Sequence, residues 1–171
     1  MAKVESVLRN LLGALGGDHH LLGQLQDGVT IAKFKNIPDE VLESIYALGY
    51  SHFQSGNTQE AHDLFLYLSF HDHTNPRFLA SFGACCLKMG KYEQAAQVLE
   101  LAADMAPSDP GPALNLAHTF ESMGDKDKAR DALLAASARA EKQPQYQPIK
   151  QIADTMMERM APALSPQAKG E

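Results

Sequence analysis

The stretch that decides the fold reads GYSHFQSGNTQEAHDLFLYL at 49–68, GACCLKMGKYEQAAQVLELA at 83–102 and AHTFESMGDKDKARDALLAA at 117–136. The three segments are equally spaced along the chain, and their alignment needs no insertion. Six positions recur in all three units. They hold a large apolar residue, a small residue, glycine, alanine and two further apolar or small residues: Leu48, Phe82, Leu116; Gly49, Gly83, Ala117; Gly56, Gly90, Gly124; Ala61, Ala95, Ala129; Phe65, Leu99, Leu133; Leu68, Ala102, Ala136.

A 34-residue period with this pattern resembles the tetratricopeptide repeat (TPR). Each unit then consists of two antiparallel helices that approach closely at the small residue. The glycine lies at the turn between them, where a positive φ is often needed. The large apolar residue fills the space between successive hairpins. We therefore expect an all-α protein, a right-handed TPR superhelix of three helix-turn-helix repeats with an N-terminal helical arm and a C-terminal capping helix.

The rest of the chain divides around these repeats. The predicted units are an N-terminal arm with an amphipathic helix, three repeats within 37–143, a capping helix and a disordered tail: 1–36, 42–75, 76–109, 110–143, 144–160 and 161–171. The capping helix presents one apolar face, as the end of a solenoid requires. That face holds Ile149, Ile152, Met156, Met157 and Met160.

Helix caps agree with these boundaries. Asn75 and Asp109 each precede a proline, which is the order expected at a helix start. Asp125 is expected to cap the second helix of repeat three, and Asn57 with Glu60 predicts a capping box. Pro38 with the acidic pair that follows it opens the first helix in the same way.

Composition excludes several function classes. The 171 residues are 44% hydrophobic and carry a formal charge of −6, which argues against a general nucleic-acid or anionic-membrane binder. No apolar run approaches the roughly 18 residues of a membrane span, and the N-terminus lacks the apolar stretch of a signal peptide. The two cysteines are neighbours, so a disulfide scaffold is excluded and a reducing compartment fits. We expect a soluble cytoplasmic protein.

The concave groove of a TPR fold is lined by the first helix of each hairpin, between the positions already assigned to the core. The groove positions are Tyr46, Tyr50 and Phe53 in repeat one, Ala80, Ala84 and Leu87 in repeat two, and Leu114, His118 and Glu121 in repeat three, with Arg77 and Lys88 at the rim. A groove that clamps a carboxylate needs a fork of cationic donors. This groove is aromatic or small instead, which suits an extended peptide with apolar anchors.

The three aromatic residues of repeat one have alternative explanations. Aromatic residues on an amphipathic helix more often belong to the core than to a binding site. Another alternative is that the N-terminal arm of the same chain, or a second copy of the chain, covers these three residues.

A narrower resemblance covers residues 27–95. Its landmarks are Gly28–Ala32 before the first repeat, Leu42–Tyr50, the aromatic-Gln-Ser-Gly turn at Phe53–Gly56, Asp72-His73, and Gly83-Ala84-Cys85. Together they resemble the class II translocator chaperones of bacterial type III secretion, the LcrH/SycD group. Two features depart from that pattern: Pro76 in the segment DHTNP, and repeat three at 110–133, which is closer to a generic TPR.

The resemblance implies a cytoplasmic chaperone that binds an extended apolar segment of the hydrophobic translocator proteins in its groove and keeps them soluble and export-competent. Homodimers through the N-terminal region or the first repeat are common in the group, and some members act with a transcription regulator. The implied dimer contact lies on the amphipathic helix of the arm, at Val7, Leu8, Leu11, Leu12 and Leu15. The implied peptide-binding groove consists of the residues assigned above. No nucleic acid or membrane partner is expected.

Enzyme chemistry is not indicated. His71-Asp72-His73, expected in a loop, and His19-His20 lack the further ligands of a metal site. The paired cysteines lack a neighbouring base and are expected to be buried, so we predict no catalytic residue, no metal and no cofactor. Two alternatives to the translocator chaperone stay open: a TPR adaptor between folded partners, and a co-chaperone of needle subunits.

Deleting residues 1–20 is expected to lower the oligomeric mass, because it removes the apolar face of the predicted arm helix. Static light scattering of the full chain and the deletion variant at equal concentration measures this. An unchanged mass would place the contact between copies elsewhere in the chain.

Overall fold

The computed structural model describes residues 30–160, and these form helices joined by short turns. The helices are α3 (Ile31–Phe34), α4 (Asp39–Gln54), α5 (Thr58–His71), α6 (Pro76–Lys88), α7 (Tyr92–Met105), α8 (Gly111–Ser122), α9 (Lys126–Ala140), the 3-10 helix η1 (Pro144–Tyr146) and α10 (Gln147–Met160). The part of the chain described contains no β-strand. None of these helices is long and apolar enough to cross a membrane.

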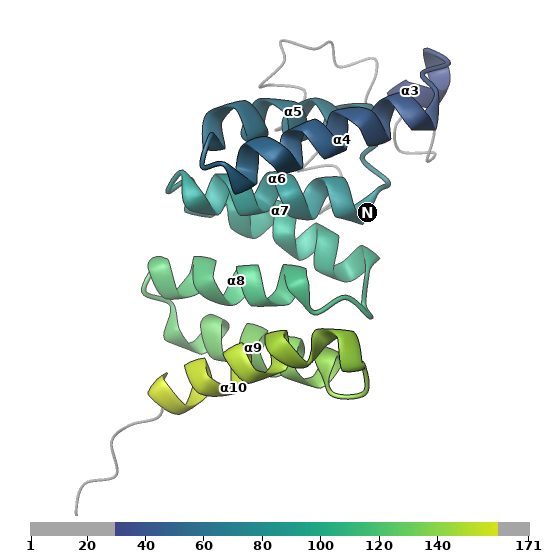
Figure 1. Ribbon diagram of the computed structural model, residues 1–171. Coiled ribbons are helices and arrows are strands. Elements are labelled where there is room, and N and C mark those ends of the chain that lie inside the picture. Colours follow the sequence, from purple (N-terminus) through teal and green to yellow (C-terminus); the bar gives the residue numbers. More distant parts are fainter. Residues whose placement is uncertain (1–29, 161–171) are drawn as a thin grey trace, which may run out of the picture.

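The helices form three hairpins that stack in sequence order, α4–α5, α6–α7 and α8–α9, with α10 packed on α9 at the end of the stack (Figure 1). Gly56, Gly90 and Gly124 occupy the three turns with φ of 83°, 74° and 80°. That left-handed conformation strains any residue with a Cβ atom, which is why glycine recurs at the same place in each repeat. The expectation of an all-α TPR fold is confirmed.

Within each hairpin the two helices meet at a small residue. A Cβ added to Gly49 would lie 2.9 Å from the Phe65 ring, and one added to Gly83 would lie 2.6 Å from Leu99. Phe65 and Leu99 are buried, 1% and 0% exposed, so each large side chain fills the space that a glycine leaves. The small residue therefore recurs because the two helices of a hairpin pack closely at this position.

The large apolar residue of the repeat is buried in the second and third hairpins but exposed in the first. Phe82 is fully buried and its ring lies 5.2 Å from His62 of the preceding hairpin. Leu116 is 7% exposed, but Leu48 is 51% exposed. The expectation that Leu48 fills a space between hairpins is wrong, because no hairpin precedes it within residues 30–160.

Most of the predicted caps are present. The side chains of Asn75 and Asp125 accept hydrogen bonds from backbone N–H groups of the first turn, at 3.1 Å each. Asp109 also accepts from Gly111 N, at 2.8 Å, although the helix begins one residue later than predicted, with Pro110 at the cap position. The capping box at Asn57 is wrong: its amide lies 3.4 Å from the His52 ring, and its side chain accepts no backbone bond from the helix.

Helix α10 buries a slightly different face from the predicted one. Met156 is buried and Met157 and Met160 pack partly against the core, but Ile152 is 45% exposed. Ala153, which was not predicted for this face, is 0% exposed, because its small side chain allows α10 to approach its neighbours closely. Polar contacts add to this packing, since Asp154 accepts hydrogen bonds from Ser137 at 2.6 Å and from Lys150 at 2.6 Å.

Of the two histidines expected in a loop, His73 lies in the turn between α5 and α6, as predicted, but His71 does not. His71 is the last residue of α5 and is 6% exposed. Its Nδ1 lies 2.9 Å from the Tyr67 carbonyl oxygen, and its ring stacks on that of Tyr67 at 3.9 Å. His73 is also buried, 4% exposed. Burial lowers the pKa of His71 by disfavouring the imidazolium form, and Lys35 adds to the effect.

Several predictions fall outside the described residues. They are the amphipathic arm helix with its dimer contact at Val7, Leu8, Leu11, Leu12 and Leu15, the His19-His20 pair and the tail at 161–171. Of the arm, the structure describes Thr30 onward, including α3, which contacts α5.

Replacing Gly83 by valine is expected to lower the free energy of unfolding by about 1–3 kcal/mol, because the new side chain overlaps Leu99. Urea denaturation followed by circular dichroism measures the change. Ala84→Val is the matched control, since the neighbouring side chain lies at the edge of a cavity and is half-buried. Equal losses in the two variants would contradict the proposed packing constraint.

Stability should fall between pH 7.5 and pH 5 in a way that depends on His71. Its pKa is lower in the folded chain than the ordinary value of 6.5, so the unfolded chain takes up the proton first. The stability contribution is complete above that value and is lost as the pH falls through the folded pKa. Urea denaturation at both pH values should show a smaller loss for His71→Asn than for the wild-type chain, and an identical loss would refute the assignment.

Candidate functional site

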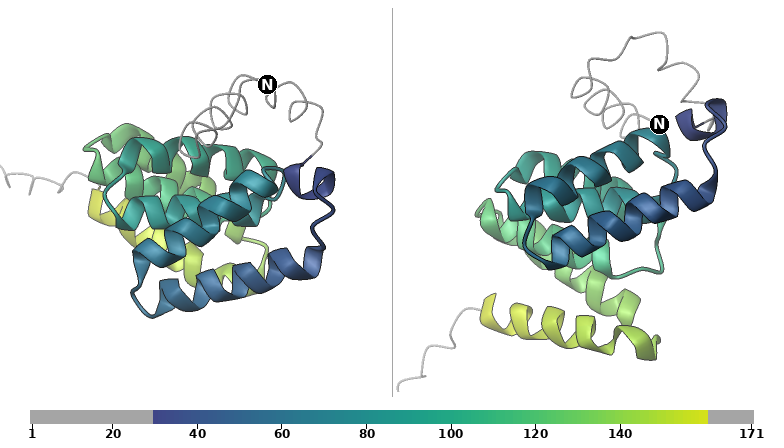
Figure 2. Two further views of the ribbon diagram at one scale, coloured as in Figure 1. Left: turned by 90° about the horizontal axis from the view of Figure 1, so that it is seen from above. Right: turned by 45° about the horizontal axis from the view of Figure 1, so that its top comes forward.

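A cavity of about 240 Å³ opens between the first helices of the three hairpins. Its lining residues are Tyr46, Tyr50, Phe53, Phe65, Arg77, Ala80, Ser81, Ala84, Asp109, Gly111, Pro112 and Asn115. Helix α4 supplies an aromatic wall, α6 supplies small side chains, and the start of α8 supplies a polar end. Seen from above, α4 forms one edge of the stack (Figure 2).

Spacing along α4 and α6 explains why these side chains converge. Tyr46, Tyr50 and Phe53 are separated by four and three residues, which places them on one helical face. Ala80 and Ala84 are related in the same way on α6. The backbones of α6 and α8 approach closely, whereas α4 and α6 meet mainly through side chains, which leaves room for the cavity.

Tyr46 is fixed on several sides. Its ring centroid lies 5.5 Å from that of Phe65 and 5.8 Å from that of Phe78. The Arg77 guanidinium lies 4.3 Å above its ring, and the Ser81 hydroxyl donates to its hydroxyl oxygen at 3.3 Å. Such edge and stacking contacts hold a ring in one place, so Tyr46 is a preformed part of the wall.

The ring of Tyr50 makes fewer contacts than the ring of Tyr46. Among the described residues its ring contacts that of Tyr46, at 6.3 Å, and no other ring, and the residue is 48% exposed. Phe53 is half-buried, and the Lys88 ammonium group lies 4.3 Å above its ring. A bound apolar group would therefore remove Tyr50 surface from water while Tyr46 stays in its existing contacts.

Two charged residues line the cavity. Arg77, besides lying over Tyr46, forms an ion pair with Glu43 of α4. Asp109 lies in the loop before α8 and accepts a hydrogen bond from Gly111. The cavity therefore combines an apolar wall with a polar end.

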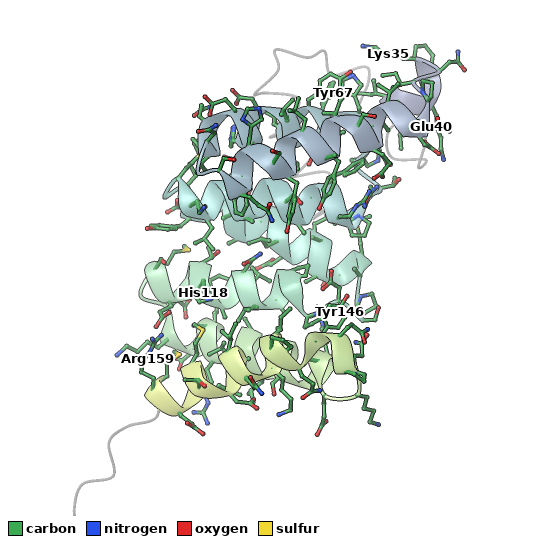
Figure 3. All side chains as sticks on the ribbon, in the orientation of Figure 1. Lys35, Glu40, Tyr67, His118, Tyr146 and Arg159 are labelled. Atoms are coloured by element: carbon green, nitrogen blue, oxygen red, sulfur yellow. The ribbon has the colours of Figure 1, made fainter. Side chains whose placement is uncertain are left out.

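Six of the nine residues predicted for the peptide-binding groove line this cavity: Tyr46, Tyr50, Phe53, Arg77, Ala80 and Ala84. Leu87, Leu114 and His118 do not line it. Leu87 and Leu114 pack partly against the core, and His118 is half-buried on α8 (Figure 3). Glu121 forms an ion pair with Arg159 of α10, at 3.0 Å.

Sequence reasoning missed the polar end of the cavity. Ser81 and Asn115 occupy the same position in successive repeats, next to the groove positions chosen. Gly111 occupies the repeat position of Arg77, which was predicted at the groove rim. A systematic comparison of repeat positions would have found them. Phe65 was assigned to the core alone, although its ring also reaches the cavity.

The described residues contain no group of three or more histidine, cysteine or carboxylate side chains that could hold a metal ion. Both cysteines are fully buried, as predicted. Burial raises the pKa of Cys85 to about 11 and that of Cys86 to about 12, so both thiols are protonated at neutral pH. Neither is poised as a nucleophile.

Comparison with known families places TPR-related sequences along the repeats. Residues 37–102 match the family described as anaphase-promoting complex, cyclosome, subunit 3, and residues 86–151 match the family described as tetratricopeptide repeat.

Individual proteins give a narrower relationship. The low calcium response locus protein H of Yersinia pestis is 32% identical over 112 residues, which cover 66% of this chain and 67% of that protein. The type III secretion translocator chaperone SycD of Yersinia enterocolitica superposes with a TM-score of 0.72 at 28% identity, covering 77% of this chain and 98% of SycD. PcrH in complex with the chaperone binding region of PopD superposes with a TM-score of 0.70 at 31% identity, covering 72% and 93%.

The two solved structures share the fold of this chain over 72–77% of its length. The sequence resemblance at 27–95 is thereby confirmed. The chain belongs to the LcrH/SycD family of type III secretion translocator chaperones.

Proposed function

We propose that this protein is a cytoplasmic chaperone that holds an extended apolar segment of a type III secretion translocator in the cavity between α4, α6 and α8. The observation that carries the proposal is an aromatic wall, Tyr46, Tyr50 and Phe53, facing the small side chains Ala80 and Ala84. The relative PcrH has been crystallised with the chaperone binding region of PopD, which supports a peptide as the occupant.

The size of the cavity also favours a peptide. At about 240 Å³ it is smaller than the roughly 300–1,000 Å³ of typical small-molecule and cofactor sites. It would accept individual apolar side chains of an extended chain. Burying such anchors contributes about 25 cal/mol per Å², against the cost of ordering the peptide.

A holding role needs no catalytic step. A translocator exposes apolar surface that drives association in water, and covering part of that surface keeps it soluble. The net charge of −6 helps to keep the complex in solution. The protonated, buried thiols and the helix-terminal carboxylates offer no nucleophile with an adjacent base. We therefore propose a binding protein without enzymatic activity.

The division of the chain follows from this proposal. The three hairpins carry the binding cavity, α10 covers the last hairpin, and residues 1–36 form an arm that contacts a second copy. The arm deletion described above tests the last point independently of peptide binding.

Tyr50→Asp is expected to abolish recovery of a soluble complex when the chaperone is co-expressed with tagged hydrophobic translocators. The carboxylate would be buried against the apolar anchor, while the fold should persist because Tyr50 is 48% exposed and its ring is held only loosely, against Tyr46. Affinity pull-down measures the complex, and circular dichroism with thermal melting checks the fold.

Tyr67→Asp is the matched control. Tyr67 is 37% exposed and stacks on the ring of His71, but lies on α5 outside the cavity lining. It should keep the complex. Loss of helical signal in Tyr50→Asp would assign Tyr50 to the core, and an intact complex would exclude this cavity as the binding site. No complex of the wild-type chain with any translocator would reject the proposed function.

A further inference from the structure

The polar end of the cavity carries a carboxylate that forms no ion pair with a described cation. Asp109 lines the cavity, and its Oδ1 accepts a hydrogen bond from Gly111 N at 2.8 Å. Within residues 30–160, no lysine, arginine or histidine side chain forms an ion pair with this carboxylate. A ligand in the cavity therefore meets a negative charge beside the aromatic wall.

The loop that presents this carboxylate is held in place from behind. Pro110 is fully buried and Pro112 is buried, so the backbone on both sides of Gly111 has little freedom. Arg139 of α9 donates to the Asp109 carbonyl oxygen at 3.4 Å, and Gln143 donates to the Ser108 carbonyl oxygen at 2.7 Å. The carboxylate thus stands on a rigid loop, and little side-chain or loop ordering is required when it binds.

The cation that lines the cavity does not offset this charge. Arg77 is already paired with Glu43 and lies over the Tyr46 ring. Glu43 also lines a second hollow of about 210 Å³, together with Asp39 and Asp72. The Glu43 carboxylate offsets the charge of Arg77, so Asp109 has no ion-pair partner among the side chains that line the cavity.

We propose that the cavity selects a segment in which a lysine or arginine lies next to the apolar anchor, with Asp109 as the partner of that cation. This inference rests on the proposed function and adds a specificity residue to it. Asn115 of α8, which also lines the cavity, presents an amide that can donate to and accept from a peptide main chain. The anchor supplies affinity, and Asp109 selects among apolar segments by their neighbouring charge.

The test is a double-mutant cycle in solution. Overlapping fluorescein-labelled peptides that tile the translocator captured above are titrated against the full-length chaperone by fluorescence polarisation. The tightest peptide is then remade in versions in which one lysine is replaced by norleucine or one arginine by citrulline.

Each version is titrated against the wild-type protein and the variants Asp109→Asn and Asp131→Asn. Asparagine keeps the acceptor for Gly111 N, so the loop should hold its shape. Asp131→Asn removes the same charge from an exposed position of α9.

One basic position of the peptide should couple to Asp109. Its replacement is expected to weaken binding to wild type and to Asp131→Asn by about fivefold to tenfold, and binding to Asp109→Asn by less than about twofold. The wild-type affinity should also fall with added salt more steeply than that of Asp109→Asn.

Equal affinity of wild type and Asp109→Asn for every peptide version overturns the inference and leaves the chaperone function intact. A uniform loss without coupling to a basic position overturns it as well. If no translocator peptide binds the wild-type chain, the proposed function itself fails.

Discussion

The contact between Phe65 and Gly49 connects the core of this protein to its candidate site. A side chain at Gly49 would collide with the ring at 2.9 Å, so the hairpin closes only because that position is empty. The same ring lies 5.5 Å from Tyr46, the fixed part of the aromatic wall. The close approach of α4 and α5 therefore sets where the wall stands, and the cavity depends on packing inside the first hairpin.

The site combines a rigid frame with one loosely held element. Tyr46 is fixed by rings, a guanidinium and a hydroxyl, and Asp109 is fixed by two prolines and by hydrogen bonds from behind its loop. Tyr50 alone among the wall tyrosines keeps about half of its surface in water. A frame of this kind can bind different apolar anchors with little ordering cost, while a fixed charge limits which neighbours are accepted. Such a balance fits a family that must recognise an unfolded segment.

Prediction from the sequence succeeded where the repeat dictates local geometry. The turn glycines, the small residue of each hairpin and the caps at Asn75 and Asp125 could be assigned because each depends on residues within one helical hairpin. It failed at Leu48 and Ile152, which lie toward the two ends of the stack. The same repeat position is buried or exposed according to whether another hairpin covers it. The repeat period in the sequence does not show which hairpins have a neighbour.

The sequence by itself determined the helical repeats, their boundaries and the aromatic face of α4, because 3.6-residue periodicity and turn chemistry are local properties. Tertiary structure alone decided that Asp109 and Asn115 share a cavity with Tyr46, which lies two hairpins earlier in the chain. It also decided that Leu87 and Leu114 belong to the core edge. The physical reason is that the spacing between α4, α6 and α8 is set by the side chains packed between hairpins, and no periodicity within one helix encodes that distance.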